Sequence, residues 1–410
     1  MLIKNQRLDF IPFSSLDCSQ YWRVKPLTHT VMNNIHKLYL QRCADLANLA
    51  TSSVSPNPRV GAVLVYDNKV IGEGYFQQDG QSHAEVNCLN SVAEENRPFI
   101  TKSTLYVSLE PCCFHGRTPA CTNLIIKNKI PKVVIGQLDQ TAEVSGQGLA
   151  ILEKKGVETL AFPDFKPTER VALPRQVFAA QGRPYVLLKY ARSADHYLAP
   201  PGEDNYWITG KMSRRLVHFW RSRTNAILVG AGTLLHDNPQ LDTRLYPGVS
   251  PLVCIVDLGN KVTHSDFKIV SKKAEREFIL IQTEGAQNIN NFKQVFIPKE
   301  LTNKLFTYDF RKPQVIRSRK HGSSKAEKKA AKSIIVMILA AIANEQINHI
   351  TVEGGSWLLN LFLSAQLWDE ARVFTGKDTF FSSGLPAPVV PGKPNDTITL
   401  ENDLLQRWYR

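Results

Sequence analysis

The sequence lacks an apolar run of the roughly 18 to 20 residues that a membrane-spanning helix requires. The best candidate, Ile334 to Ile342, is half that length and is typical of a buried helix. The first residues also lack a continuous apolar core followed by a small-residue cleavage site, which is the pattern of a secretory signal. We therefore expect a cytoplasmic protein without a membrane segment.

Cysteine is scarce, and the seven cysteines are an odd number. Without an export signal we expect no disulfide framework, because the cytoplasm keeps thiols reduced. Cys43, Cys88 and Cys254 lie in apolar patterns and are predicted to be core residues. The cysteines clustered between positions 112 and 121 indicate metal or redox chemistry instead.

Acidic residues are nearly absent from one strongly basic segment, residues 311–333. It holds nine Lys or Arg and one Glu, so it contributes +8 to the net charge of +13 and leaves +5 for the rest of the chain. The segment also has no aromatic residues on which bases could stack, and a solvated loop leading into a helix explains it at least as well. We expect a small-molecule substrate and no nucleic-acid partner.

The length of 410 residues favours two domains. We assign residues 34–180 to the first domain and residues 183–410 to the second. Residues 1–33 lack clear periodicity and are expected to be an extension that is either disordered or not translated. Pro163 to Ala180 is predicted to be the connector, because three prolines interrupt it.

Strand and helix patterns alternate in both halves, which predicts sheets covered by helices and hence an α/β fold. In the first half we expect a helix over 36–50 and strands over 61–65, 70–75, 104–109 and 132–136, with a hairpin turn at Asp67-Asn68. In the second half we expect strands over 185–190, 226–230, 252–257 and 350–352 and helices over 211–223 and 333–348.

A candidate zinc site combines H-A-E at 83–85, P-C at 111–112 and Cys121. One histidine and two thiolates leave the fourth position of a tetrahedral zinc open for water, and the metal makes that water acidic. Glu85, two residues after His83, can move protons beside the metal without binding it. This order of residues is the signature of zinc deaminases that act on nucleosides and nucleobases. Cys112 directly follows the proline at the strand end, so we expect Cys113 to be a bystander.

The second half has no G-x-G-x-x-G after a strand, so a Rossmann domain is not supported. Glycines at 230, 232, 354 and 355 instead follow predicted strands, where they permit close approach of the backbone to a ligand. Arg221 and Arg244 can hold a phosphate with paired donors.

Four stretches of the first half resemble the bifunctional deaminase–reductases of bacterial riboflavin biosynthesis. They are S-P-N-P-R-V-G-A-V-L-V at 55–65, I-G-E-G-Y at 71–75, H-A-E-V-N at 83–87 and L-E-P-C-x-x-x-G-R-T-P-x-C at 109–121. Eight residues separate Cys112 from Cys121, a spacing typical of that family. The resemblance implies a cytidine-deaminase-like three-layer domain. It also implies that His83, Cys112 and Cys121 bind zinc, that Glu85 transfers protons, and that Asn57 and Arg117 hold a phosphoribosylaminopyrimidine.

An ordered set of motifs in the second half is similar to the same family's reductase domain, which implies a dihydrofolate-reductase-like fold that uses NADPH. The cofactor contacts that it implies are Ala191, Trp207, Thr233, Asp237, Gly355 and Ser356. The implied substrate contacts are Asn205, Arg221, Leu241, Arg244 and Glu353, with Lys189 as a catalytic residue facing the substrate. In this interpretation hydride passes from NADPH to C1′ of the ribose, which opens to a ribityl chain.

Phe76, Phe114 and His196 depart from the family pattern, which has histidine, histidine and glycine at the corresponding places. They motivate one alternative, a pseudo-deaminase that retains only the reductase activity. A second alternative is a zinc deaminase directed to nucleic acids. We further expect a homo-oligomer.

Overall fold

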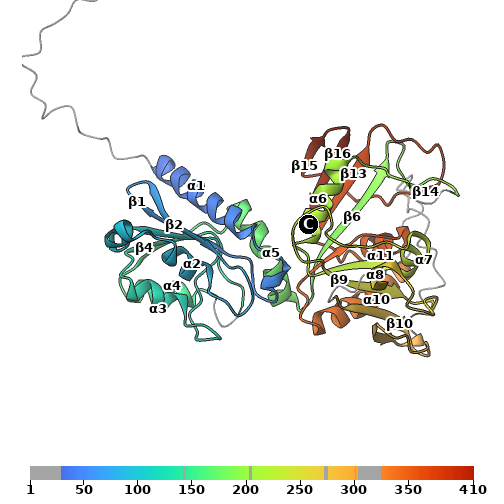
Figure 1. The fold of residues 1–410 in the computed structure, drawn as a ribbon, viewed down its shortest axis with the longest axis horizontal. Helices are drawn as coiled ribbons and strands as arrows, with labels where there is room; N and C mark the ends of the chain where they lie inside the picture. The colour runs from blue at the N-terminus through green and yellow to red at the C-terminus, as the bar shows by residue number, and fades with distance from the viewer. Residues whose placement is uncertain (1–28, 142–144, 203–205, 272–275, 301, 303–324) are drawn as a thin grey trace, which may run out of the picture.

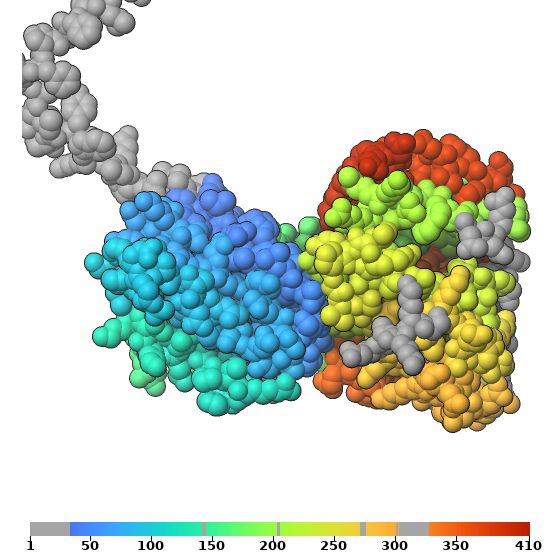
Figure 2. Space-filling model, viewed as in Figure 1, coloured from blue at the N-terminus to red at the C-terminus, as the bar shows by residue number. Residues whose placement is uncertain are grey.

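The computed structural model describes residues 29–141, 145–202, 206–271, 276–300, 302 and 325–410. Within them the chain forms two α/β lobes that lie side by side (Figures 1 and 2). The extension 1–28, the basic residues 311–324 and Asn205 lie outside the described residues. No helix among the described residues is long and apolar enough to cross a membrane.

The first lobe is built on a five-stranded sheet with the order β2-β1-β3-β4-β5. Its strands are β1 (Gly61–Tyr66), β2 (Lys69–Tyr75), β3 (Thr104–Val107), β4 (Lys132–Ile135) and β5 (Glu158–Ala161). β1 runs antiparallel to β2 and β3, whereas β3, β4 and β5 are parallel. The predicted hairpin turn is confirmed, since Asp67 and Asn68 both have positive φ, 47° and 58°.

Helices cover both faces of this sheet, which gives three layers (Figure 1). The helices of the lobe are α1 (His29–Ala47), α2 (Ala84–Asn90), α3 (Cys121–Lys127), α4 (Gln147–Lys154) and α5 (Lys166–Gln181), with the 3₁₀ helices η1 (Ser52–Val54) and η2 (Glu94–Lys102). On one face Leu40 and Cys43 of α1 pack against Val63 of β1. On the other face Cys88 of α2 and Ile125 of α3 pack against residues such as Leu64. The alternation of β1 side chains between two cores explains why this strand is apolar throughout.

Two predictions about helices in the first lobe were wrong. Helix α1 begins at His29 and ends at Ala47, not at 36 and 50. The predicted connector 163–180 is mostly the helix α5, with one proline in its first turn and Pro174 inside it. A proline in the first turn removes only an N–H that has no partner within the helix. Pro174 is buried with Val171 and Val177, and we attribute its tolerance to this packing.

The second lobe contains a nine-stranded sheet with the order β11-β10-β9-β8-β12-β6-β13-β16-β15. Its strands are β6 (Tyr185–Ser193), β8 (Ala226–Gly230), β9 (Leu252–Asp257), β10 (Phe278–Thr283), β11 (Lys293–Ile297), β12 (His349–Val352), β13 (Glu370–Gly376), β15 (Asp396–Leu400) and β16 (Asp403–Tyr409). A small separate ladder joins β7 (Tyr197–Ala199) to β14 (Leu385–Pro386). In the order of the large sheet, the strands from β11 through β13 pair in parallel with one another. β16 is antiparallel to β13, and β15 is antiparallel to β16.

Helices cover this sheet as well, and consecutive strand residues alternate between two cores. The helices are α6 (Lys211–Arg221), α7 (Ala231–Asp237), α8 (Lys268–Ser271), α10 (Lys325–Asn344) and α11 (Ser356–Ala365). Ala226 and Leu228 of β8 pack with α10 and α11, whereas Ile227 and Val229 pack with Leu234 of α7. Parallel strands that are buried on both faces account for the continuous apolar runs of the sequence.

The C-terminal residues complete the sheet, although the sequence resemblance hardly extends beyond position 376. β16 pairs with β13 over its whole length, from Asp403 opposite Gly376 to Tyr409 opposite Glu370. Trp408 lies in the main core, and its indole N–H donates to the carbonyl of Gly392. The lobe therefore depends on its last strand.

Replacing Trp408 with alanine tests this dependence. We expect Trp408→Ala to lower the free energy of unfolding by about 3 to 5 kcal/mol, because it removes a large buried aromatic side chain. Chemical denaturation followed by circular dichroism measures the change. The control is Trp207→Ala, whose side chain is 64% exposed and whose loss should change stability by less than about 0.5 kcal/mol. Equal stability of the two variants would contradict the assignment of β16 to the core.

Candidate active sites

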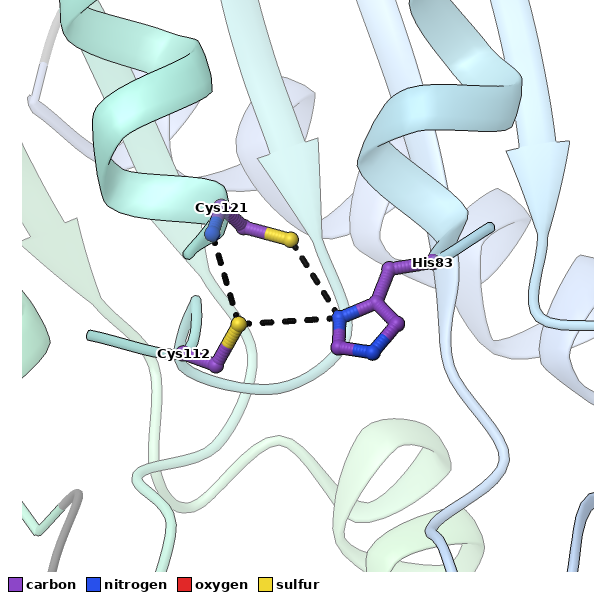
Figure 3. A group of neighbouring side chains, drawn as sticks. All are labelled: His83, Cys112 and Cys121. Carbon is purple, nitrogen blue, oxygen red and sulfur yellow. Dashed lines mark hydrogen bonds between the residues drawn. The ribbon is translucent and has the colours of Figure 1, made fainter. Parts of the chain in front are cut away.

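His83, Cys112 and Cys121 converge although they come from three separate segments (Figure 3). His83 precedes the first residue of α2, Cys112 follows β3, and Cys121 begins α3. The Nδ1 atom of His83 lies 3.6 Å from the sulfur of Cys112 and 3.4 Å from the sulfur of Cys121. The three ligand atoms lie within 4.8 Å of one another.

This geometry fits zinc. Bonds of about 2.3 Å to sulfur and 2.0 Å to nitrogen in a tetrahedron separate the two ligand atoms by roughly 3.5 Å. The two nitrogen–sulfur distances match that separation, and three protein ligands leave a fourth position open. Cys113 is not among these atoms, in agreement with its interpretation as a bystander. None of the six described cysteines forms a disulfide.

Four hydrogen bonds orient the ligands. Thr118 Oγ1 lies 3.2 Å from Nε2, the second ring nitrogen of His83, which turns Nδ1 toward the sulfurs. The backbone N–H of Cys121 donates to the sulfur of Cys112 over 3.3 Å. Asn87 donates to the carbonyls of Tyr75 and Ser82, which fixes the loop that leads into His83.

Glu85 lies in the first turn of α2, directly beside the ligand group, and is only 4% exposed. Burial and the neighbouring Cys112 raise the pKa of its carboxyl group, which His83 partly opposes. A buried carboxyl group with a raised pKa can accept a proton and release it again. Its position and its environment thus both suit the proton-transfer role expected for it.

Glu110, which the sequence motif contains, has a role that we did not foresee. Its buried carboxylate accepts hydrogen bonds from the backbone N–H groups of Asp139, Gly146, Gly148 and Leu149. These hydrogen bonds therefore connect the segment before Cys112 to the loop that precedes α4 and to the first turn of that helix. The signal was present in the sequence, since a glutamate directly after an apolar strand needs buried partners.

Asn57 and Arg117, the expected substrate residues of the first lobe, meet at a third residue that the sequence did not reveal. Asp79 accepts a hydrogen bond of 2.6 Å from Nδ2 of Asn57 and forms an ion pair of 2.6 Å with Arg117. Its backbone N–H donates to the carbonyl of Ser53. Asp79 thus connects the two segments that carry the expected substrate contacts.

The two phenylalanines that depart from the family pattern lie in different surroundings. Phe76 is buried and contacts the ring of His83 edge to face, with 5.4 Å between ring centroids. Phe114 is 50% exposed. His115, its neighbour, lies 3.2 Å from the carbonyl of Gly116 and is not part of the ligand group.

In the second lobe, a buried carboxylate lies at the carboxyl ends of the parallel strands. Glu353 follows β12 and forms a bidentate ion pair with Arg221, with N–O distances of 2.8 and 2.7 Å. Nζ of Lys189, on the adjacent strand β6, lies 3.9 Å from the same carboxylate. Burial opposes ionisation of Glu353, but Arg221 and Lys189 outweigh it and hold its pKa at about 2. Burial lowers the pKa of Lys189, and Glu353 partly opposes this.

Arg244 and Leu241 lie in the segment that follows α7, next to this group. Nη1 of Arg221 donates to the carbonyl of Asp242, whose carboxylate pairs with Arg244. Leu241 is buried, and its carbonyl accepts a hydrogen bond from Arg276. The sequence reasoning missed Asp242 and Arg276. Since the paired donors of Arg221 face Glu353, the exposed guanidinium of Arg244 is the better candidate for a phosphate contact.

The expected cofactor residues gather at the ends of β8 and β12. An added Cβ at Gly354 would lie 2.8 Å from Oγ1 of Thr233, and Gly355 has φ 77° and precedes the buried Ser356 of α11. Positions 230 and 232 leave open space where a side chain would be. The backbone there is accessible to a ligand such as a dinucleotide, which fits NADPH.

Three further expected cofactor residues lie on β6, in the segment before α6 and at the end of α7. Ala191 of β6 packs near Phe374, and Trp207 stacks on Arg214 with 4.4 Å between the guanidinium carbon and the ring centroid. Asp237 ends α7 and is exposed.

The fold and the two sites define a zinc-binding deaminase domain joined to a reductase domain. The model of the cytidine and deoxycytidylate deaminase zinc-binding region matches residues 33–137, and that of the RibD C-terminal domain matches residues 184–376. Riboflavin biosynthesis protein RibD of Aquifex aeolicus (strain VF5) is 32% identical over 84% of this chain and 87% of its own length. RibD of Escherichia coli (strain K12) is 30% identical over 86% and 91%.

A solved structure from Thermotoga maritima, a diaminohydroxyphosphoribosylaminopyrimidine deaminase/5-amino-6-(5-phosphoribosylamino)uracil reductase, covers 92% of this chain and 99% of its own. It is 28% identical, with a TM-score of 0.74. The chain belongs to the RibD family of riboflavin biosynthesis proteins. It is an enzyme with deaminase and reductase domains, and its cofactors are zinc and NADPH. The expected family and fold class are confirmed, and neither alternative function is favoured.

The ligand assignment predicts different zinc contents for variants of two adjacent cysteines. We expect Cys112→Ser to lose most of the bound zinc, because a neutral hydroxyl replaces a thiolate ligand. Cys113→Ser, the matched control at the next position, should retain about one zinc per chain. Atomic absorption of purified protein measures the metal. Zinc loss in the Cys113 variant would overturn the assignment.

Proposed function

We propose that the chain catalyses two steps on one ribosyl phosphate. The first lobe hydrolytically deaminates 2,5-diamino-6-(5-phosphoribosylamino)pyrimidin-4-one and releases ammonia. The second lobe then reduces the ribosyl group to ribityl. The observation that carries the proposal is the presence, in one chain of this family, of a zinc-competent His–Cys–Cys group beside the buried Glu85 and of an Arg–Glu–Lys group at the ends of the second sheet.

In the deaminase lobe, His83, Cys112 and Cys121 would hold zinc, which when bound supplies water that is acidic enough to react at neutral pH. Glu85 accepts the proton of that water and passes it to the departing amine. Asn57 and Arg117 bind the substrate, and Asp79 keeps them in register with each other. Departure of the amine as neutral ammonia requires this proton, which makes Glu85 the residue on which turnover depends most.

In the reductase lobe, Thr233 and the turn at Gly355 would help to hold NADPH, which when bound would supply the hydride that reduces C1′ of the ribose. Lys189 delivers a proton to the ring oxygen as the C1′–O bond opens, so that charge balances at both ends of the broken bond. Glu353, held in place by Arg221, accepts hydrogen bonds from the sugar hydroxyls. Arg244 and the backbone at Leu241 bind the rest of the substrate. The cofactor contacts in this proposal are Ala191, Trp207, Thr233, Asp237, Gly355 and Ser356. Asn205 is expected to be a further substrate contact.

We also propose residues 34–180 and 183–410 as the two functional domains. Their proposed division at 180–183 lies at the end of α5, where Gly182 has φ 62° and terminates the helix. A homo-oligomeric state, a cytoplasmic location and the absence of a nucleic-acid partner stay predictions.

Separate assays of the two half-reactions test the function and the role of Glu85. With the diaminopyrimidine substrate, the wild-type protein should release ammonia without NADPH and should oxidise NADPH when it is added. Glu85→Gln should lower ammonia release by at least about 100-fold, because the amide cannot carry the proton. It should retain zinc and should oxidise NADPH with the deaminated substrate.

Glu94→Gln is the control for this variant, since the side chain of Glu94 is 84% exposed on η2. It should behave as the wild type in both assays. Ammonia release by Glu85→Gln at the wild-type rate would contradict its role. Wild-type ammonia release without NADPH oxidation would sink the reductase proposal.

Lys189→Met tests the proton donor of the second lobe. We expect kcat for NADPH oxidation to fall about 100-fold, the size of a lost acid–base contribution. Ammonia release should not change, because Lys189 lies in the other lobe. Lys293→Met is the control, since Lys293 forms a surface ion pair with Glu345 and its side chain is 60% exposed. An unaltered kcat in Lys189→Met would show that the proton comes from another group.

A further inference from the structure

A small cavity lies between the two lobes, and both lobes contribute to its walls. Its volume is about 20 Å³, enough for one water-sized particle. The first lobe supplies Asn57, Pro58 and Arg59 together with Arg175 of α5. The second lobe supplies Arg223, Asn225, Asn348 and His349.

The charged residues around this cavity all have the same sign. Three arginines line it, and no aspartate or glutamate does. Among the described residues, Arg59 and Arg175 have neither a hydrogen bond nor an ion pair from their guanidinium groups. Glu370 is the carboxylate that interacts electrostatically with Arg59, and Arg372 already binds it in a bidentate pair. Burial and the neighbouring Arg223 and Arg372 lower the pKa of Arg59 to about 10, and it remains charged at neutral pH.

The other polar groups do not neutralise this charge. Arg223 donates to neutral oxygens, among them the carbonyls of Asn48 and Phe219 and the hydroxyl of Ser222, and it lies over the rings of Phe219 and Tyr246. His349 stays neutral, because burial and the arginines lower its pKa to about 3. Its Nε2 atom is buried without a hydrogen-bond partner. The three arginines are partly buried, and groups of one charge with unused donors in such a place are satisfied by a counter-ion or by ordered water.

We propose that this cavity binds a small inorganic anion of halide size, held by Arg59 and Arg175 next to Arg223. The size follows from the volume of the cavity. The anion joins the 52–59 segment, α5 and the end of α6. Hydrogen bonds from Ser52 to Ser222 and from Asn348 to Pro56 already link the 52–59 segment to the second lobe. The anion therefore stabilises the contact between the lobes. The proposal is independent of the reactions proposed above.

Thermal unfolding of the zinc-loaded full chain tests this site. Potassium chloride is titrated against potassium gluconate at constant ionic strength, so that only an ion small enough to enter the cavity has a specific effect. Chloride should raise the melting temperature saturably by on the order of 2 °C, because it binds the folded state alone. The rise should be absent in Arg59→Gln and in Arg175→Gln. Should one of these variants fail to fold, the other makes the comparison.

Arg97→Gln is the matched control, since Arg97 is an exposed arginine paired with Glu94. It should keep the full response to chloride. A bromide-soaked crystal should show an anomalous peak between the guanidinium groups of Arg59 and Arg175. Absence of a saturable rise, an equal rise in all variants, or no bromide peak would overturn the site. An arginine-dependent response to phosphate but not to halide would overturn the assigned size.

Discussion

The close approach of one imidazole nitrogen and two cysteine sulfurs is the constraint on which the first lobe depends. The 3.4 and 3.6 Å separations are set by helix starts and a strand end, which the core of the lobe fixes. Several buried polar contacts hold these ends in place, above all the Glu110 carboxylate with its four backbone donors. The ability of the site to bind a metal thus depends on the hydrogen bonds that hold the loops around the sheet in place.

In the second lobe, buried polar contacts also hold the site in place, and here they stabilise a buried negative charge. Glu353 is a buried carboxylate that would be costly to ionise alone, and Arg221 and Lys189 compensate for its burial. Both cations come from neighbouring elements that meet at the carboxyl ends of parallel strands. The Glu353 carboxylate thereby stays ionised and oriented while it is shielded from solvent. A hydride-transfer site requires these properties of its substrate contacts.

The zinc ligands could be predicted from sequence because the motif residues are chemically unusual and keep a fixed order. Strands such as β9 could be predicted because a short run of apolar residues is typical of a strand that is buried on both faces. Helix α5 could not, since its prolines oppose a helix locally and tertiary packing, such as that of Val171 on Ala44 and Ala47 of α1, stabilises it. Asp79 and Arg276 could not be found either, because charged loop residues acquire their meaning from partners far away in the sequence.

The three departures from the family pattern leave the ligand group intact for physical reasons. His196 adopts φ 70°, the left-handed conformation that glycine adopts more easily, so its backbone keeps a conformation open to the glycine of the family pattern. Phe76 packs against the ring of His83 edge to face, which restrains the orientation of this ligand. Phe114 is exposed and lies outside the ligand group. Asp79 meanwhile joins Asn57 and Arg117, the two proposed substrate residues, through contacts of 2.6 Å each, and neither contact involves a phenylalanine.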